Sequence, residues 1–357
     1  MAINDWKRGY EKISENEHPT ASRNPSKLTT MENLKVASFF CGCGGADLGT
    51  LGGFEYLGRR YARLPFDVAY AADIDKWAVR TYNENFAHKA VCADVTEVDF
   101  ATLPDVDVLV AGFPCQSFSM VNQNGRTDGD DRAALYRQVV RFLHEKRPKA
   151  FVCENVRGLV TMKGGAVIRR IADEFTDCGY NVQWRLMDAA DYGIPQFRKR
   201  VIIVGIRKDL DCRFEYPEPT TADCHIPARR IITTLDGVDR RWFFSERVVQ
   251  GVMKYREKGG PWNRGIPQNL DEPSRTIASG LLRSGFASSN PSVLVDAATN
   301  TYRRYTDREA AAFQSFPEDF KWPCAVTHTF HQIGNAVAPV FFWHVMAKLA
   351  EALEGVR

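Results

Sequence analysis

The sequence predicts an α/β fold, in which a doubly wound parallel sheet forms the main domain and a smaller, irregular lobe is added to it. Apolar runs alternate with stretches of helical pattern from Leu34 to about Arg207, which is the order of successive β–α units. The alternation stops after Arg207 and gives way to a segment rich in Pro, Gly, Arg and aromatic residues. Helical character then returns near the C-terminus. No internal repeat is visible.

The composition is that of a folded protein with a large core. Of the 357 residues, 44% are apolar and 25% are charged, enough for one large domain and a smaller lobe. Nine cysteines, an odd number without a C-x-x-C pair, indicate reduced thiols and exclude a disulfide framework and a structural zinc site. No apolar stretch approaches a membrane span, and the N-terminus lacks the apolar segment of a signal peptide. We therefore expect a cytoplasmic protein that binds neither a membrane nor a metal.

The pattern of residues along the chain predicts three parts. Residues 1–33 are polar and form an N-terminal extension, residues 34–208 and 292–357 form the main domain, and residues 209–291 form the inserted lobe. Strands are expected at 36–40, 66–71, 106–111, 150–153 and 201–206. Helices are expected at 77–85, 133–145, 167–178, 306–313 and 340–353.

The net charge of +3 says little about partners, because 47 basic residues nearly balance 44 acidic ones. The distribution says more: basic clusters at 198–200, 229–230, 240–241 and 303–304 lie in the second half, near Trp and Phe residues. Basic residues interleaved with aromatic ones suit a surface that follows phosphates and touches bases. For any one pair, solvated arginines beside half-buried rings explain the pattern at least as well.

A glycine-rich loop follows the first expected strand. Gly42, Gly44 and Gly45 let backbone N–H groups lie against a ligand, although a plain tight turn explains the pattern about as well. The second strand ends at Asp73, whose carboxylate can accept both hydroxyls of a ribose. Asp94 follows another apolar step and can accept from the exocyclic amine of an adenine. Each acid alone is more simply a helix cap, but together they outline a nucleoside pocket.

A cysteine is presented where a buried strand ends. The octapeptide 112–119 follows the expected strand 106–111; Gly112 permits close approach and Pro114 fixes the turn before Cys115. If strand 150–153 is the neighbour, Glu154 emerges beside Cys115. A carboxyl group near a thiol, both beside an adenosine-like cofactor, suits nucleophilic attack on an electron-poor ring.

These motifs and their order resemble those of the cytosine carbon-5 DNA methyltransferases that depend on S-adenosylmethionine. The resemblance covers nearly the whole chain from Leu34 onward, and it implies a Rossmann-like methyltransferase domain with a target-recognition lobe at 209–291. The matching segments are 40–45, 112–119, 154–156, the Q-x-R-x-R motif at 196–200, 275–277 and 332–337.

The resemblance implies roles for individual residues. Cys115 would attack carbon 6 of a cytosine flipped out of the duplex, and Glu154 would contact its ring N3 and exocyclic amine. Arg198 and Arg200 would hold the nucleotide and the thiol region, with Arg198 nearer the pyrimidine O2. The implied cofactor contacts are Phe40, Gly42, Gly44, Gly45, Asp73, Ile74, Asp94, Val95, Gly112, Pro114, Asn335 and Ala336. The implied DNA contacts are Gln116, Ser117, Ser119, Gln196, Arg275 and Thr276.

The chain departs from the family pattern at the second strand. The family usually has glutamate followed by a bulky aromatic residue, where this chain has Asp73 followed by Ile74. Ribose binding should survive the shorter carboxylate, but stacking on the adenine is reduced to an aliphatic contact. The polar segment 120–129 directly follows the thiol motif, and we expect a loop that closes over DNA.

Double-stranded DNA is the partner that the resemblance implies, in a bacterial modification enzyme that we expect to be a monomer. A restriction endonuclease acting on the same site is the companion that such an enzyme can have. An RNA enzyme of the same chemistry is a second hypothesis, but the Ser-Pro-Pro-Cys and Cys-Phe-Thr motifs typical of that branch are absent. A catalytically silent DNA-binding protein is a third, and it would be expected to lose the thiol or the glutamate.

Overall fold

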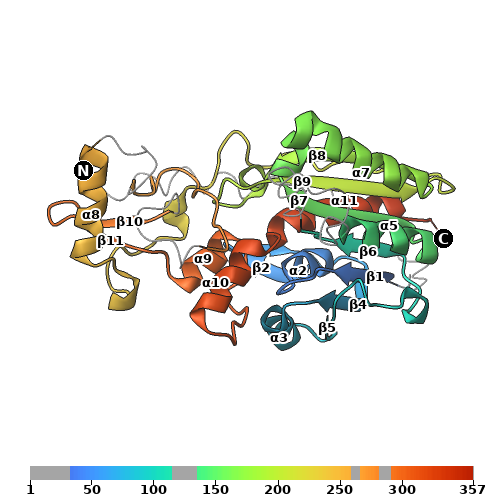
Figure 1. The fold of residues 1–357 in the computed structure, drawn as a ribbon, viewed down its shortest axis with the longest axis horizontal. Coiled ribbons are helices and arrows are strands. Elements are labelled where there is room, and N and C mark those ends of the chain that lie inside the picture. The colour runs from blue at the N-terminus through green and yellow to red at the C-terminus, as the bar shows by residue number, and fades with distance from the viewer. Residues whose placement is uncertain (1–32, 115–134, 259–265, 281–290, 357) are drawn as a thin grey trace, which may run out of the picture. The chain divides into compact units, whose positions relative to one another are not determined.

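A seven-stranded sheet organises the larger part of the described chain, in the order β5-β4-β1-β6-β7-β9-β8 (Figure 1). The computed structural model describes residues 33–114, 135–258, 266–280 and 291–356. The strands of this sheet are β1 (Leu34–Phe39), β4 (Phe66–Asp73), β5 (Val91–Cys92), β6 (Val108–Ala111), β7 (Ala150–Val156), β8 (Tyr180–Asp188) and β9 (Lys199–Arg207). The first five strands in this order, β5, β4, β1, β6 and β7, pair in parallel, as the alternation of apolar runs and helices predicts.

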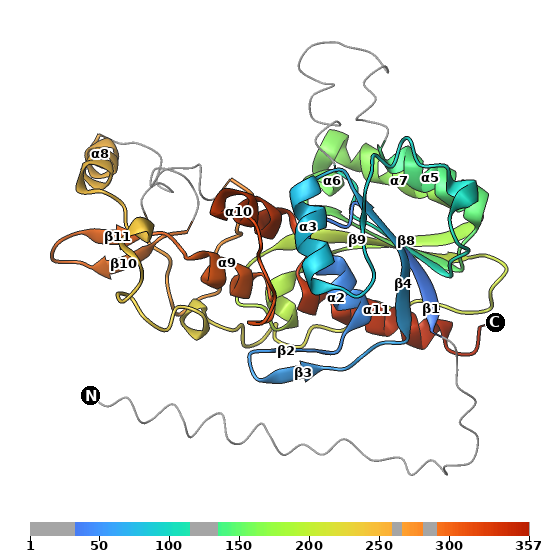
Figure 2. The same ribbon diagram turned by 90° about the horizontal axis from the view of Figure 1, so that it is seen from below.

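Helices cover both faces of the sheet. Alternate residues of β6 point to opposite faces, and all four are buried. Helices α5 (Leu135–Lys146) and α7 (Ala166–Asp177) pack on one face, whereas α2 (Gly45–Leu51) and α11 (Pro339–Leu353) pack on the other (Figure 2). The doubly wound α/β fold that the sequence predicts is therefore confirmed.

The end of the sheet differs from the expected parallel arrangement. Strand β9 forms where a strand was expected, but it runs antiparallel to both β7 and β8, and β8 was not expected. The physical reason is the connection between β8 and β9, which contains only the short 3-10 helix Ala189–Tyr192 and its flanking turns. A parallel pair needs a crossover of about a dozen residues or more.

Smaller elements complete the described chain. Helix α3 (Lys76–Asn85) follows β4, the hairpin β2 (Phe54–Tyr56) and β3 (Arg59–Tyr61) follows α2, and the four-residue helix α6 (Gly158–Thr161) follows β7. The lobe contains helix α8 (Glu246–Glu257) and the antiparallel pair β10 (Val293–Asp296) and β11 (Thr301–Arg303). Helices α9 (Asp307–Phe313) and α10 (Val326–Asn335) then lead into α11.

The lobe continues past the boundary that the sequence suggested. Tyr302 of β11 packs against Val249 and Val252 of α8, and the amide of Phe244 donates to the carbonyl of Tyr302. Strands β10 and β11 lie in the range 292–357 assigned to the main domain, yet they pack with the lobe. We therefore propose that the lobe extends through Arg303.

One segment of the chain corrects an expectation about membranes. By length and composition alone, Val326–Leu353 is long and apolar enough to cross a membrane. In the structure it is two helices, α10 and α11, separated at residues 336–338, and 56% of its most apolar window is buried. Its apolar side chains join the core beside the sheet, so the segment packs as core helices.

Candidate active site

Four parallel strands bring the predicted site residues to one edge of the sheet. Phe39 of β1 is in register with Ala72 of β4 and Ala111 of β6, and Ala111 is in register with Cys153 of β7. The residues that come next on the four strands are Asp73, Phe40, Gly112 and Glu154, in that order across the edge. With a strand spacing of about 4.8 Å, this row is about 14 Å long.

The three glycines of the first loop have different surroundings. A Cβ at Gly42 would meet no atom within 4 Å, so this glycine borders open space. A Cβ at Gly44 would lie within 2.3 Å of the Phe86 ring, and one at Gly45 within 2.2 Å of the Val337 carbonyl oxygen. Gly44 and Gly45 are therefore required for packing behind the loop, and Gly42 is the position with room for a ligand.

Asp73 is held at the end of β4 by two backbone groups. Its Oδ2 accepts from the amide of Gly42 and its Oδ1 from the amide of Asp75, both at 2.8 Å. Burial raises the pKa of this carboxyl group. Each oxygen keeps capacity for one further hydrogen bond, because a carboxylate offers about four acceptor positions. The neighbouring Ile74 is 69% exposed, the largest value among the exposed large apolar side chains of the described residues.

Asp94 and Val95 follow β5, which pairs with the end of β4. The amide of Ala93 donates to the carbonyl of Asp73 at 3.0 Å, so the two acid-bearing segments adjoin. The Oδ1 atom of Asp94 accepts from both the amide and the hydroxyl of Thr96, at 2.9 and 2.7 Å. Val95 is buried in the core with α5 and α7, so its side chain packs inward.

Asn335 and Ala336 end helix α10, close to the glycine loop. The Cβ of Ala336 would lie 3.3 Å from a Cβ at Gly45, which places it beside the start of α2. Asn335 is exposed, with its amide nitrogen 3.4 Å from the ring of His331. Asn335 and Ala336 therefore lie next to the glycine loop, which is the position that a role in cofactor binding requires.

Glu154 forms an ion pair with Arg200 at the edge of the sheet. The Nε atom of Arg200 lies 2.9 Å from Oε1 of Glu154, and the two side chains are 13% and 12% exposed. The carboxylate lies at the end of β7 and the guanidinium at the start of the antiparallel β9, so adjacent strands supply the pair. The structure thus brings these two predicted residues together.

Arg198 is placed differently from Arg200. Only 2% of it is exposed, and its guanidinium donates to the carbonyls of Ile277, Gly334 and Ala336 at 2.8 to 3.1 Å. These carbonyls belong to two segments distant in sequence. Arg198 therefore ties the strand β9 to the segments around 277 and 334, whereas Arg200 is the arginine that contacts Glu154.

Of the other predicted DNA contacts in the described chain, Gln196 is fully buried. Its Nε2 donates to the carbonyl of Phe313 at 2.8 Å, and its Oε1 accepts from the amide of Ile277 at 2.9 Å. Thr276 is exposed and its hydroxyl donates to the carbonyl of Phe197. Arg275 is partly buried and donates to the carbonyl of Ile266. Of these three, only Thr276 is exposed.

Asn155 is a residue of this region for which no role was predicted. It is buried directly after Glu154, and its Nδ2 donates to the carbonyl of Phe113 at 2.7 Å. Phe113 is itself buried, and Gly112 donates from its amide to the carbonyl of Phe39. The exposed Pro114 ends the described part of this loop. The resemblance at 154–156 was the available signal in the sequence, but only the fold shows that the Asn155 side chain contacts the carbonyl of Phe113.

Four predicted residues, Cys115, Gln116, Ser117 and Ser119, lie outside the described residues. The expected closing loop 120–129 also lies there.

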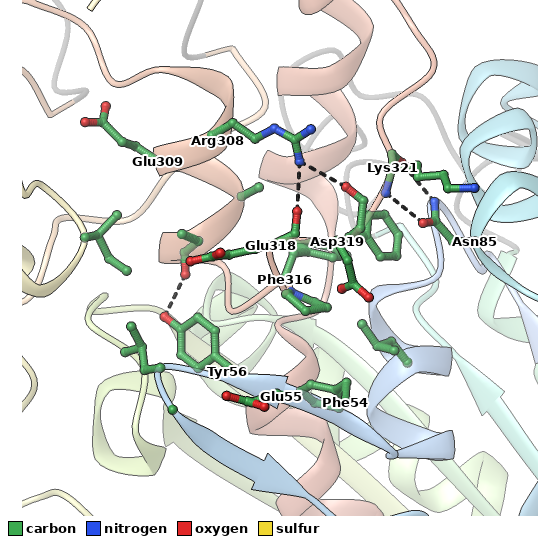
Figure 3. A pocket seen from close by; sticks show the side chains of 18 of the residues that line it. Phe54, Glu55, Tyr56, Asn85, Arg308, Glu309, Phe316, Glu318, Asp319 and Lys321 are labelled. Atoms are coloured by element: carbon green, nitrogen blue, oxygen red, sulfur yellow. Dashed lines mark hydrogen bonds between the residues drawn. The ribbon is translucent and has the colours of Figure 1, made fainter. Parts of the chain in front are cut away.

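A cavity of about 1150 Å³ lies behind the glycine loop (Figure 3). Its walls come from the β2–β3 hairpin, helix α9 and residues 316–321; Tyr56 donates to the carbonyl of Ala312, and Arg308 to that of Glu318. Phe86 and Phe316, which line it, are the rings nearest to Gly44 and Gly45. None of the predicted catalytic or cofactor-binding residues lines this cavity, although Arg230 of the lobe does, and its charged residues are of both signs.

Comparisons with known proteins place this geometry in a family. A family model described as C-5 cytosine-specific DNA methylase matches residues 34–351. Type II methyltransferase M.NgoFVII of Neisseria gonorrhoeae is 32% identical over 348 residues, which cover 89% of this chain and 87% of that protein. Type II methyltransferase M1.ScrFI of Lactococcus lactis subsp. cremoris is 30% identical, covering 99% of this chain and 88% of that protein.

Solved structures share the fold at lower identity. The S. pombe Dnmt2 methyltransferase aligns with a TM-score of 0.69 at 18% identity, over 91% of this chain and 100% of that one. The Entamoeba histolytica methyltransferase EhMeth has a TM-score of 0.69 at 15% identity, over 90% and 99% of the two chains.

The fold and these matches define a methyltransferase. More particularly, the chain belongs to the family of C-5 cytosine-specific DNA methylases, which methylate carbon 5 of cytosine in DNA. Of the three hypotheses drawn from the sequence, the DNA enzyme is therefore confirmed.

Proposed function

We propose that the protein transfers the methyl group of S-adenosyl-L-methionine to a cytosine extruded from duplex DNA, at a specific short sequence. The observation that carries the proposal is the row of strand ends, with Asp73 at one end and Glu154 at the other. The row is about 14 Å long, room for a nucleoside beside a second ring. Gly112 stands between them and leads into the segment that carries Cys115.

The described residues fit such a cofactor. Gly42 borders open space where a ligand can approach the backbone, and Asp73 has acceptor capacity for ribose hydroxyls. Ile74 offers an exposed apolar surface for one face of an adenine, and Asp94 an acceptor for its amine. When bound, S-adenosylmethionine supplies an electrophilic methyl group on a sulfonium.

The protein's own groups prepare the cytosine. We propose that the Cys115 thiolate forms a bond to carbon 6, which moves the electron pair of the C5–C6 double bond to carbon 5. Carbon 5 then takes the methyl group. Loss of the carbon 5 proton to water and cleavage of the S–C6 bond restore the double bond and release the thiolate. Glu154 would hold ring N3 and the exocyclic amine while electron density enters the ring.

The two arginines take separate parts in this proposal. Arg200 orients Glu154 through the 2.9 Å ion pair, so the carboxylate keeps one oxygen on Arg200 and presents the other to the base. Arg198 holds the surrounding segments together, because its guanidinium donates to three carbonyls. That Arg198 is the arginine nearer the pyrimidine O2 stays a prediction.

The lobe is the part that we propose reads the target sequence. Arg229, Arg230, Arg240 and Arg241 are exposed in it, and exposed guanidinium groups can reach phosphates and base edges. Two further candidates, Arg264 and Arg283, lie outside the described residues. Since the matched relatives are named type II methyltransferases, we infer a modification role in the bacterial cytoplasm, with a restriction endonuclease as its companion.

The decisive experiment replaces the nucleophile. Cys115→Ser should bind DNA but fail to transfer a labelled methyl group to it, and the matched control Cys224→Ser, at an exposed thiol of the lobe, should transfer normally. A duplex with 5-fluorocytosine at the target should trap a covalent complex with the wild type and the control only. Undiminished transfer by Cys115→Ser would show that the thiol does not carry the reaction.

A further inference from the structure

Arg303 is a basic residue of the lobe that cannot reach DNA. The sequence groups it with Arg304 among the basic and aromatic clusters, yet its exposure is 0%. A guanidinium has five N–H donors. All five are used: two by Glu309 at 2.8 Å each, and one each by the carbonyls of Leu235, Thr234 and Arg304 at 2.8 to 3.0 Å.

These partners come from both parts of the chain. Thr234 and Leu235 belong to the lobe, as does β11, which carries Arg303, whereas Glu309 belongs to α9. Glu309 also accepts from the amide of Thr306 at 2.7 Å in the capping box of α9. The ion pair therefore fastens two lobe segments to the first turn of α9.

The other end of α9 leads to the proposed base pocket. The carbonyl of Phe313, the last residue of α9, accepts from Gln196, and the side chain of Gln314 accepts from the same amide at 3.2 Å. Gln196 begins the segment that contains Arg198 and Arg200. A short helix thus joins the Arg303 pair at one end to the segment that leads into β9 at the other, and β9 carries Arg200, the partner of Glu154.

Apolar contacts also join the lobe to these helices. Trp242 packs against Phe330 of α10 with ring centroids 5.9 Å apart. Apolar contacts are not directional, whereas a bidentate arginine–carboxylate pair fixes both distance and angle. The ion pair therefore adds a constraint on distance and angle to the apolar contacts between the lobe and these helices.

We propose that Arg303 and Glu309 are positioning residues that set the lobe against the base pocket, and that discrimination between target and near-target sequences depends on them. The proposal rests on the proposed function, because it requires that the lobe reads DNA. Neither residue touches DNA, cofactor or the reacting atoms.

The test measures discrimination rather than activity. Wild type and Glu309→Gln methylate the same plasmid, and bisulfite sequencing gives the ratio of rates at target and single-mismatch sites. A mismatch costs about 1–3 kcal/mol, so a loosened lobe should lower this ratio about tenfold. Binding of S-adenosylmethionine, measured by calorimetry, should stay within about twofold. An unchanged ratio in a folded Glu309→Gln protein overturns the proposal.

Two further variants keep the result clear. Loss of one partner of a buried pair is strongly destabilising, so Arg303→Lys, which keeps the charge but has three donors, is measured in the same way if Glu309→Gln does not fold. Phe175→Leu, in the core far along the sheet, should lower stability without changing the ratio. If it lowers the ratio equally, general loss of stability explains the effect and the proposal is wrong.

The reading role of the lobe is tested separately. Replacement of the exposed Arg240 and Arg241 by alanine should weaken DNA binding or change the site preference. If it does neither, the proposed reading role fails while the result for Glu309→Gln still stands on its own measurement.

Discussion

Asp47 carries a pH-dependent part of the stability of this fold. Its carboxyl group is buried in α2 behind the glycine loop, where it accepts from the hydroxyls of Ser38 at 2.9 Å and Tyr82 at 3.3 Å. Burial raises its pKa from 3.8 to about 6, because two hydroxyl donors do not replace the lost hydration of the charge. The folded protein therefore binds this proton more tightly than the unfolded chain.

The sign and size follow from this difference. A raised carboxyl pKa stabilises the fold fully below pH 3.8, and the contribution is lost as the pH rises through about 6. The difference corresponds to about 3 kcal/mol in full, of which about 2 kcal/mol is present at pH 4.5 and almost none at pH 7.5. The Asp47→Asn variant has an amide in place of the carboxyl group and does not bind this proton. The stability of the wild type relative to this variant should therefore rise by about 2 kcal/mol between pH 7.5 and pH 4.5.

Urea unfolding followed by circular dichroism at the two pH values measures this change. Asp223→Asn makes the same chemical change at an exposed carboxyl group, and its effect should not vary with pH by more than a few tenths of a kcal/mol. A difference between wild type and Asp47→Asn that is the same at both pH values would refute the reasoning.

Three further outcomes are expected. Gly42→Ala should raise the Kd for S-adenosylmethionine at least tenfold by calorimetry, whereas Gly58→Ala, with similar left-handed strain of about 1–2 kcal/mol, should leave it unchanged. Asn155→Ala should lower kcat roughly 10- to 100-fold with DNA affinity retained, because the Phe113 carbonyl loses its donor; equal kcat would contradict this. Arg200→Met should slow trapping of 5-fluorocytosine, and unchanged trapping in the folded variant would exclude its role at Glu154.

The sequence predicts those parts of the site that depend on strand order. Asp73, Gly112 and Glu154 each follow an apolar run, and parallel strands bring such positions to one edge whatever the loops do. The antiparallel direction of β9 relative to β7 was not predictable in this way. An antiparallel strand and a parallel one have the same apolar pattern when both are buried.

Other features depend on segments that are distant in the chain. Arg198 and Arg200 belong to one motif, Arg198 directly before β9 and Arg200 within it, but the carbonyls of Ile277 and Gly334 bury the first and Glu154 pairs with the second. Likewise Arg303 is buried by carbonyls from the lobe and by Glu309. Neither partner set has a local pattern, so neighbouring arginines look alike until the fold is known.

The contact between Gly45 and the Val337 carbonyl has a consequence for how the protein is made. The loop near the N-terminus is backed by a segment that precedes the last helix, with no room between them for even one methyl group. During synthesis the ribosome releases Val337 long after Gly45, so the loop lacks its back wall until that distant segment has been made. A nascent chain that stops before Val337 therefore cannot complete the packing of this loop.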